Sequence, residues 1–249
     1  MTDFAIVIPS RYASERLPGK PLRDIAGKPM LQHVCERAGE SAAGQVVVAT
    51  DDTRIEEAVS KFGATVCMTR DDHQSGTDRI AEVAEKSGWP DELIVVNLQG
   101  DEPMMPAALI DQCASLLDDP AADLATLASP LADPANLDDP NVVKVVTDDN
   151  GFALYFSRAA IPFSRGSDTD ALAAQTALHH HGIYAYRVGT LRRIVAAEPS
   201  ATERCERLEQ LRAMSLGMRI KVGIPAERPG PGVDTEEDLA MAERALQRA

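Results

Sequence analysis

Basic side chains cluster in the loop that follows the first apolar segment of the chain. Residues 4–8 read FAIVI, which predicts a buried parallel strand ending at Pro9. The segment after this strand carries Arg11, Arg16, Lys20 and Lys28. Such a loop emerges at the carboxyl edge of a sheet, where cations and backbone N–H groups can contact several phosphate oxygens at once. The sequence therefore predicts a binding loop for a phosphorylated ligand.

The charge of this segment differs from that of the whole chain. Residues 1–28 hold five Lys or Arg against three acids, a sum of +2, whereas all 249 residues carry a formal charge of -14. This contrast favours one specific anionic ligand over nucleic acid, which the acidic remainder would repel. The loop is not a Walker A P-loop, because Pro21 follows Lys20 where Ser or Thr is required.

Two carboxylates could hold a metal ion beside such a ligand. Asp101 follows the apolar segment 93–98, and Asp234 precedes the last predicted helix. Both are expected at the carboxyl edge of the sheet, where two carboxylates and a triphosphate can share Mg²⁺. Simpler roles also suit them, a turn residue for Asp101 and a helix N-cap for Asp234.

A sheet whose strands end at one edge would bring these side chains together, and the first half of the chain predicts one. Strands are predicted at 4–8, 46–49, 64–68 and 93–98, and helices at about 30–38, 53–62, 77–86 and after Pro106. This alternation predicts a doubly wound, mostly parallel sheet in an α/β fold.

The pattern becomes richer in strands after about residue 120. Strands are predicted at 124–131, 142–146, 152–156, 183–188 and 219–223, a polar loop at 162–178, and helices at 203–214 and 235–248. We therefore expect a single domain over residues 1–249 with a β-rich insertion at about 124–190.

Composition is that of an ordinary globular protein without a membrane segment. Hydrophobic residues make up 44% of the chain, no apolar run reaches 18 residues, and the N-terminus lacks signal-peptide features. The four cysteines, at 35, 67, 113 and 205, form no CxxC pair. They predict buried thiols in a reducing cytoplasm, without disulfides or zinc.

Seven motifs in order make the chain resemble a known enzyme family. They are IPSRYASERLPGKPL at 8–22, VVATDD at 47–52, HQSGTDRIAE at 73–82, NLQGDEP at 97–103, HHGIYAYR at 180–187, LEQLR at 208–212 and VDTEEDL at 233–239. With these motifs the chain resembles the 3-deoxy-manno-octulosonate cytidylyltransferases, or CMP-Kdo synthetases, of Gram-negative bacteria. The resemblance covers nearly the whole length.

The resemblance implies a fold, a reaction and a cofactor. Members have a three-layer α/β nucleotidyltransferase fold with a smaller β-rich portion that forms a homodimer. They couple the sugar acid Kdo to CTP with Mg²⁺, giving CMP-Kdo and diphosphate for lipopolysaccharide synthesis. The anomeric hydroxyl of the sugar attacks the α-phosphate, so no enzyme nucleophile is needed and catalysis depends on positioning and charge neutralisation.

The resemblance also implies residue roles. The family's CTP-binding residues match Pro9, Ser10, Arg11, Arg16, Lys20, Ser75, Gly76, Thr77 and Gln99. Its catalytic residues match Lys20, Asp101 and Asp234, of which the two aspartates would bind Mg²⁺. Its sugar-binding residues match Gln99, Arg158, His180, Tyr184, Glu209 and Gln210, with Arg158 facing the sugar carboxylate. His181 stands where the family usually has an apolar residue, so either His180 or His181 could face the site, and the motif favours His180.

Two alternatives remain open from the sequence. The sugar acid could instead be 8-amino-Kdo or a sialic acid, because selectivity depends on the shape of the pocket. The chain could also be a nucleotide-binding regulatory module without catalysis, although Lys20, Asp101 and Asp234 argue against that. The DxD spacing of Asp168 and Asp170 is incidental, because no apolar strand precedes it.

Overall fold

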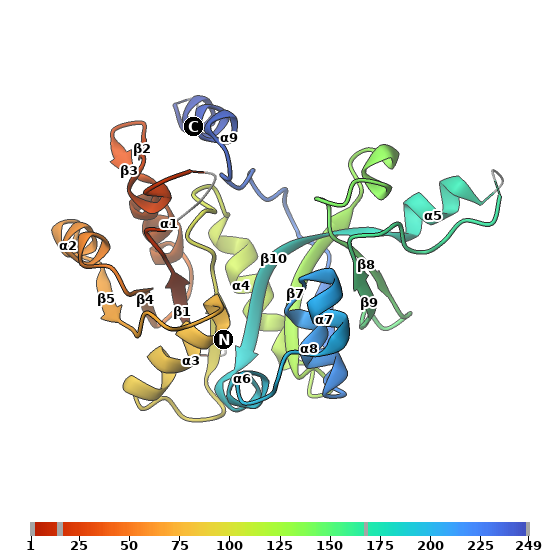
Figure 1. The fold of residues 1–249 in the computed structure, drawn as a ribbon, viewed down its shortest axis with the longest axis horizontal. Helices are drawn as coiled ribbons and strands as arrows, with labels where there is room; N and C mark the ends of the chain where they lie inside the picture. The colour runs from red at the N-terminus through yellow and green to blue at the C-terminus, as the bar shows by residue number, and fades with distance from the viewer. Residues whose placement is uncertain (1–2, 14–16, 167–168, 248–249) are drawn as a thin grey trace.

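A central sheet organises the molecule. The structure is a computed structural model that describes residues 3–13, 17–166 and 169–247. Within this part of the chain the sheet has nine strands (Figure 1). Seven follow the order β11-β7-β10-β6-β1-β4-β5, and β8 and β9 pair beside β10. The strands are β1 (Phe4–Pro9), β4 (Gln45–Thr50), β5 (Thr65–Met68), β6 (Ile94–Asn97), β7 (Leu124–Pro130), β8 (Lys144–Thr147), β9 (Ala153–Ser157), β10 (Leu178–Arg187) and β11 (Ile220–Gly223). A separate pair, β2 (Asp24–Ile25) and β3 (Lys28–Pro29), precedes the first helix.

Helices cover both faces of this sheet, which gives three layers. They are α1 (Met30–Gly39), α2 (Thr53–Lys61), α3 (Gly76–Lys86), α4 (Ala107–Ser115), α5 (Asp170–Thr176), α6 (Val188–Val195), α7 (Ala201–Glu206), α8 (Gln210–Ser215) and α9 (Glu236–Leu246). Alternate side chains of β1 enter two apolar cores: Phe4, Ile6 and Ile8 pack with α1, α2 and α4, whereas Ala5 and Val7 pack with α3, α6 and α8. The predicted three-layer α/β fold is confirmed.

The sheet reverses its winding at β1. This strand pairs in parallel with β4 on one side and with β6 on the other. The order of the strands along the chain therefore reverses its direction across the sheet at β1. The segments after β1 and β6 therefore border a crevice at the carboxyl edge. Gly100 allows the two segments to approach, because a Cβ at this position would lie 2.7 Å from Ser10 Oγ.

Three predicted secondary-structure elements differ from the structure. The predicted helix 203–214 is two helices, because Arg207 adopts a left-handed conformation with φ of 53° and ends α7. The predicted loop 162–178 contains α5, whose alanine-rich sequence favours a helix. Strand β10 begins at Leu178, five residues before its predicted start, so the polar histidine run lies within a strand.

The predicted insertion at about 124–190 contributes to two parts of the structure. Strands β7 and β10 belong to the central sheet, whereas β8, β9 and α5 project from it (Figure 1). None of the helices in the described ranges is long and apolar enough to cross a membrane. All four cysteines are free, but the prediction of buried thiols is correct only for Cys113, since Cys35 and Cys67 are partly buried and Cys205 is exposed.

Candidate active site

Two neighbouring cavities open at the carboxyl ends of β1 and β6. The first, here the loop cavity, has a volume of about 450 Å³ and is lined by the β1 loop, the start of α3 and the β6 loop. The second, here the β10 cavity, has a volume of about 640 Å³ and is lined largely by β10 and the start of α8. The lining residues common to both are Thr77, Asn97, Gln99, Glu209 and Asp234. Two ligands, one bound in each cavity, would therefore lie next to each other.

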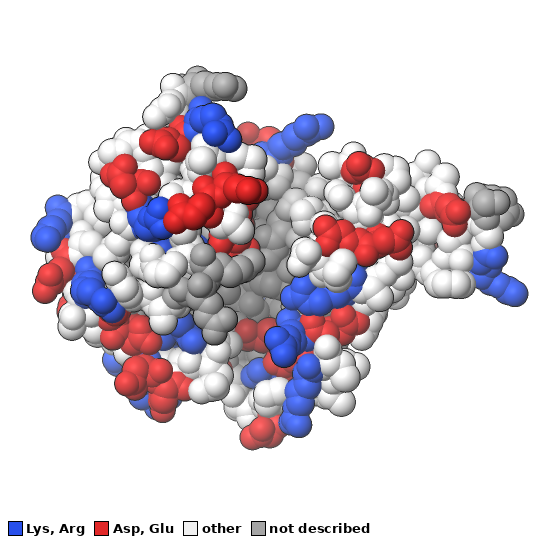
Figure 2. All heavy atoms as spheres, turned by 45° about the horizontal axis from the view of Figure 1, so that its top comes forward, with Lys and Arg blue, Asp and Glu red and all other residues white. Residues whose placement is uncertain are grey.

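Among the described residues, the face around the crevice carries no large patch of a single charge. Figure 2 shows the molecule hollowed between its body and the projecting side, with acidic and basic side chains interspersed over the visible surface. This distribution suits small anionic ligands within the hollow. The described residues offer no broad cationic surface on this face for a polyanion.

Lys20 joins the two predicted metal ligands at the loop cavity. Its Nζ lies 2.6 Å from Asp101 Oδ2 and 2.8 Å from Asp234 Oδ1. Burial alone would lower the pKa of Lys20, but the two carboxylates outweigh burial and raise it. The structure thus brings together the three residues predicted to be catalytic and keeps Lys20 cationic. The N-cap of α9 is Thr235, not Asp234, so the Asp234 carboxylate is directed to Lys20 instead.

Asp101 and Asp234 have the chemistry to hold Mg²⁺. The space between their carboxylates accommodates a positive charge, that of the Lys20 ammonium, and carboxylate oxygens are ligands that Mg²⁺ prefers. Within the described residues no cluster of three or more His, Cys, Asp or Glu could hold a metal alone. These residues therefore fit a cation that shares its coordination with phosphate oxygens and water.

Glu102 is a half-buried acid that the sequence analysis missed. Burial, reinforced by the charge of Asp101, raises the pKa of Glu102 to about 8. Asp101 and Asp234 pair with Lys20, and a further carboxylate charge beside them would be unfavourable. Its place inside the GDEP segment was the available sequence signal.

The loop cavity receives most of the predicted CTP-binding residues. Pro9, Ser10, Arg11, Lys20, Gly76, Thr77 and Gln99 line it. Ser75 is the N-cap of α3 and exchanges hydrogen bonds with Asp78 in a capping box. Arg11 Nη2 donates to the carbonyl oxygens of His73 and Ser75, at 2.5 and 3.5 Å. The predicted Arg16 lies outside the described residues, and Lys28 instead pairs with Glu36 at 2.8 Å.

The β10 cavity contains every predicted sugar-binding residue: Gln99, Arg158, His180, Tyr184, Glu209 and Gln210. Arg158 donates from Nε to the carbonyl oxygen of Glu206 at 2.9 Å and from Nη1 to that of Pro140 at 3.0 Å. The Glu206 carboxylate is occupied by Ser157 Oγ and the Arg158 backbone N–H. The Arg158 guanidinium is therefore oriented by neutral groups, and its charge suits a ligand carboxylate.

A bulge in β10 shapes the floor of the β10 cavity. The pairing with β7 shifts register between His180 and Tyr184, and Gly182 has φ of 72°. Gln99 Nε2 donates to the Gly182 carbonyl at 2.9 Å, and a Cβ at this position would lie 2.6 Å from the same nitrogen. Glycine is thus required here by both conformation and space.

His180 is an uncharged hydrogen-bonding group in this cavity. Its Nε2 lies 3.0 Å from Thr126 Oγ1. Burial, followed by the charges of His181 and His179, lowers the pKa of His180 to about 3. His181 also lines the cavity and lies 2.8 Å from Ser129 Oγ through its Nε2, so both histidines reach the site.

Buried polar atoms without partners mark the same two cavities. Among the described residues, Ser10 Oγ, Asn97 Oδ1, Tyr184 OH and Gln210 Nε2 are buried and make no hydrogen bond. Such an atom costs about 1–3 kcal/mol when it is left unpaired. A polar ligand could satisfy all four. Ser10, Tyr184 and Gln210 were predicted site residues, whereas Asn97, the first residue of the NLQGDEP motif, was given no role.

Comparisons with known proteins agree with this geometry. The model of the cytidylyltransferase family matches residues 5–220. The chain is 54% identical to a 3-deoxy-manno-octulosonate cytidylyltransferase of Halorhodospira halophila, over 98% of this chain and 97% of the relative. It is 51% identical to the enzyme of that name from Glaesserella parasuis serovar 5, over 98% and 97%.

Solved structures give the same result. A CMP:2-keto-3-deoxy-manno-octonic acid synthetase in complex with CTP aligns with a TM-score of 0.91 and 45% identity, over 99% of each chain. A 4-diphosphocytidyl-2C-methyl-D-erythritol synthase, at 16% identity and a TM-score of 0.65, shares the fold alone. The predicted resemblance is confirmed, and the chain belongs to the cytidylyltransferase family, among the 3-deoxy-manno-octulosonate cytidylyltransferases.

Proposed function

We propose that this chain transfers the cytidylyl group of CTP to Kdo, forming CMP-Kdo and diphosphate for lipopolysaccharide synthesis. The names of its relatives and the CTP complex of the similar solved structure support this reaction. One observation carries the proposal. A cavity with lysine and arginine for a triphosphate adjoins a cavity with Arg158 for a sugar carboxylate, and Gln99 and Asp234 line both.

The reaction requires positioning more than covalent catalysis. The anomeric hydroxyl oxygen of the sugar forms a bond to the α-phosphorus and gives its proton to water, and the bond from that phosphorus to the diphosphate oxygen breaks. Lys20 would leave its carboxylate partners to contact the phosphates and balance the charge of the departing diphosphate. Mg²⁺ held by Asp101 and Asp234 would neutralise further phosphate charge when bound. Because Arg11 lies beside the start of α3, it would hold the nucleotide with Ser75, Gly76 and Thr77.

The sugar acid would lie along β10. Arg158 would bind its carboxylate, and His180, Tyr184, Glu209 and Gln210 would bind its hydroxyl groups. Burial raises the pKa of Glu209, which increases the fraction of this acid that can donate a hydrogen bond. Sialic acid and 8-amino-Kdo remain the competing substrates, and the names of the relatives favour Kdo.

The proposal includes a homodimer in the cytoplasm. The projecting segment carries three exposed apolar side chains, Leu154 at 60%, Phe163 at 83% and Leu172 at 61% exposure, which would be covered by a second copy. Four free cysteines are consistent with a reducing compartment. Sedimentation of the purified chain, with Phe163→Ser as the variant expected to weaken association, tests the dimer.

An assay of diphosphate release tests the reaction itself. Purified chain with Mg²⁺ is supplied with CTP and either Kdo, 8-amino-Kdo or N-acetylneuraminic acid, and the sugar nucleotide is identified by mass spectrometry. We expect CMP-Kdo with CTP, no product in EDTA, and poor turnover of the sialic acid, whose N-acyl group has no counterpart in the matching motifs. Turnover of the sialic acid at the rate of Kdo would refute the proposed selectivity.

A further inference from the structure

Arg11 is held by a loop that is itself anchored from the opposite side. The loop between β5 and α3, here the 69–75 loop, presents its His73 and Ser75 carbonyls to the Arg11 guanidinium. The His73 side chain is buried, with 6% exposure, and packs toward α3. The backbone carbonyl of His73 therefore faces Arg11 while its ring is engaged elsewhere.

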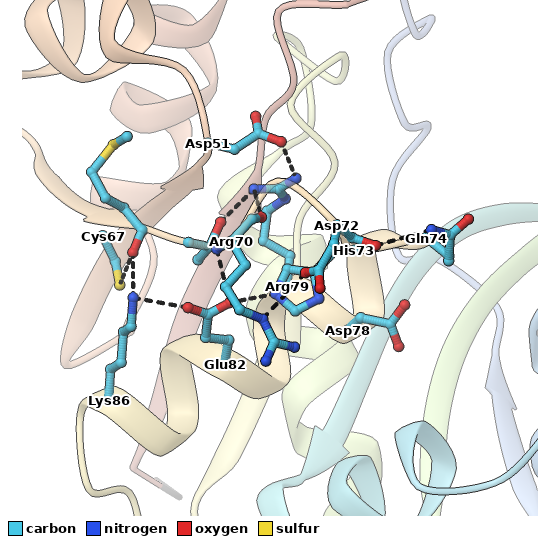
Figure 3. Close-up of polar contacts among 12 residues, drawn as sticks. Asp51, Cys67, Arg70, Asp72, His73, Gln74, Asp78, Arg79, Glu82 and Lys86 are labelled. Carbon is cyan, nitrogen blue, oxygen red and sulfur yellow. Dashed lines mark hydrogen bonds and ion pairs between the residues drawn. The ribbon is translucent and has the colours of Figure 1, made fainter.

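The His73 ring is bound by Glu82 of α3. Its Nε2 makes a short hydrogen bond to Glu82 Oε2, which also accepts from the Arg70 backbone N–H at 3.0 Å. Lys86 Nζ contacts the other carboxylate oxygen at 2.8 Å. Figure 3 shows Glu82 surrounded by Lys86, Arg70 and His73. One carboxylate thus binds the 69–75 loop at two positions, Arg70 and His73.

Burial and hydrogen bonding have opposite effects on the pKa of Glu82, and their balance favours the ionised carboxylate. Burial would raise the pKa of Glu82, but hydrogen bonds from Lys86 and His73 outweigh burial and lower this pKa to about 2. Glu82 therefore remains a charged acceptor for the His73 ring at neutral pH. Such a charge-assisted hydrogen bond is shorter and stronger than a neutral one.

A second residue of α3 anchors the beginning of the same loop. Arg79, which is fully buried, contacts Asp51 Oδ2 at 2.7 Å through Nη2, and its Nη1 donates to Thr69 Oγ1 and to the Arg70 carbonyl. Figure 3 shows this pair beside the Glu82 cluster. The end of the loop is fixed by the capping box of Ser75. His73 lies between these two anchors in the sequence. Its ring binds Glu82, and its own carbonyl oxygen accepts the hydrogen bond from Arg11.

We propose that His73 is a positioning residue whose hydrogen bond to Glu82 orients its carbonyl, and thereby the Arg11 guanidinium, toward the phosphates of the bound nucleotide. This inference rests on the proposed function, because it assigns CTP to the loop cavity. It adds His73 of the HQSGTDRIAE motif, which is not among the lining residues of the loop cavity or the β10 cavity. Replacing His73 should therefore weaken the binding of the nucleotide and leave the binding of the sugar unchanged.

A double-mutant cycle on CTP binding tests this coupling. CTP affinity is measured by calorimetry for the wild type, His73→Ala, Arg11→Ala and the double variant, together with both Michaelis constants. We expect His73→Ala to weaken CTP binding about tenfold, the effect of losing one oriented charge-assisted hydrogen bond. When Arg11 is already replaced by Ala, His73→Ala should weaken CTP binding further by less than about twofold.

Matched variants separate positioning from folding. His73→Gln retains an N–H donor for Glu82 and should bind CTP within about threefold of wild type. Gln74→Ala is the control, because exposed Gln74 donates only to the Asp72 carbonyl among the described contacts and should leave binding unchanged. If His73→Ala does not fold, Glu82→Gln, which removes the charge and keeps the shape, takes its place in the cycle. The Michaelis constant for Kdo should stay within about twofold throughout.

The possible results decide between the two proposals. Losses that multiply in the double variant, or equal losses in His73→Ala and Gln74→Ala, would overturn the positioning role. A wild-type chain that binds CTP but forms no CMP-Kdo would refute the proposed reaction, and the binding cycle would still test His73. A chain that binds no CTP would overturn both.

Discussion

Replacing Arg158 by Ala should selectively impair the use of Kdo. The guanidinium is held by two backbone carbonyls at 2.9 and 3.0 Å, and neither partner is a carboxylate. Its charge is therefore available to a ligand, and removing it leaves the carboxylate of the sugar unpaired inside the cavity. A hydrogen bond to a charged group contributes about 1.5–3 kcal/mol. At about 1.4 kcal/mol per factor of ten, kcat/KM for Kdo should fall about 10- to 150-fold.

The assay is diphosphate release with one substrate varied while the other is saturating. The Michaelis constant for CTP should change less than about twofold, because Arg158 lines only the β10 cavity. Arg158→Lys should recover part of the loss, since an ammonium keeps the charge but cannot form two parallel hydrogen bonds. Arg193→Ala removes an exposed arginine of α6 and serves as the matched control.

Unfolding temperatures must accompany these kinetics, because Arg158 also links the segments at Pro140 and Glu206. A folded Arg158→Ala protein with unchanged Kdo kinetics would show that the carboxylate is bound elsewhere. A loss confined to CTP would show that the two cavities have been assigned the wrong way round.

Three further predictions address the metal, the triphosphate and pH. Asp101→Asn and Asp234→Asn should each lower kcat by more than about 100-fold while circular dichroism stays unchanged, and wild-type turnover should stop in EDTA; activity in EDTA would contradict a metal role. Lys20→Ala and Arg11→Ala should raise the Michaelis constant for CTP and spare that for Kdo in steady-state assays, the reverse of Arg158→Ala. His180 has a folded pKa of about 3 against 6.5 unfolded, so stability is lost as pH falls from 6.5 toward 3, amounting to about 2 kcal/mol by pH 5. Urea unfolding at about pH 7.5 and about pH 5 should show a smaller acid loss for His180→Gln, and equal losses would refute the neutral buried histidine.

The sequence predicted those parts of the fold that depend on local periodicity. Strands β1, β4, β5 and β6 and helices α1 to α4 all occur where apolar spacing indicated them. Errors arose where one residue or a tertiary contact overrides the pattern. Arg207 breaks a helix by adopting positive φ, which no propensity indicates for arginine. The polar histidines of β10 form a strand because β7 and β8 pair with them.

The candidate site could be predicted where long motifs identified residues, and not where their partners lie far away in sequence. Lys20, Asp101 and Asp234 converge as predicted, although they come from three separate segments. Lys28 was placed in the binding loop by charge alone, and its pairing with Glu36 depends on how α1 turns back toward β3. The His73–Glu82 contact likewise depends on the orientation of α3.

Strand β10 also has a consequence for local opening of the structure. Its first residues, Leu178 and His179, pair with both β7 and β8, and Tyr184 to Tyr186 pair with both β6 and β7. The hairpin of β8 and β9 is therefore hydrogen-bonded to β10, the strand that forms the floor of the β10 cavity. Amide protons of β8 and of central β10 should then exchange with solvent as one cooperative unit. A ligand that protects the cavity from exchange would protect the base of the hairpin as well, with no contact to it.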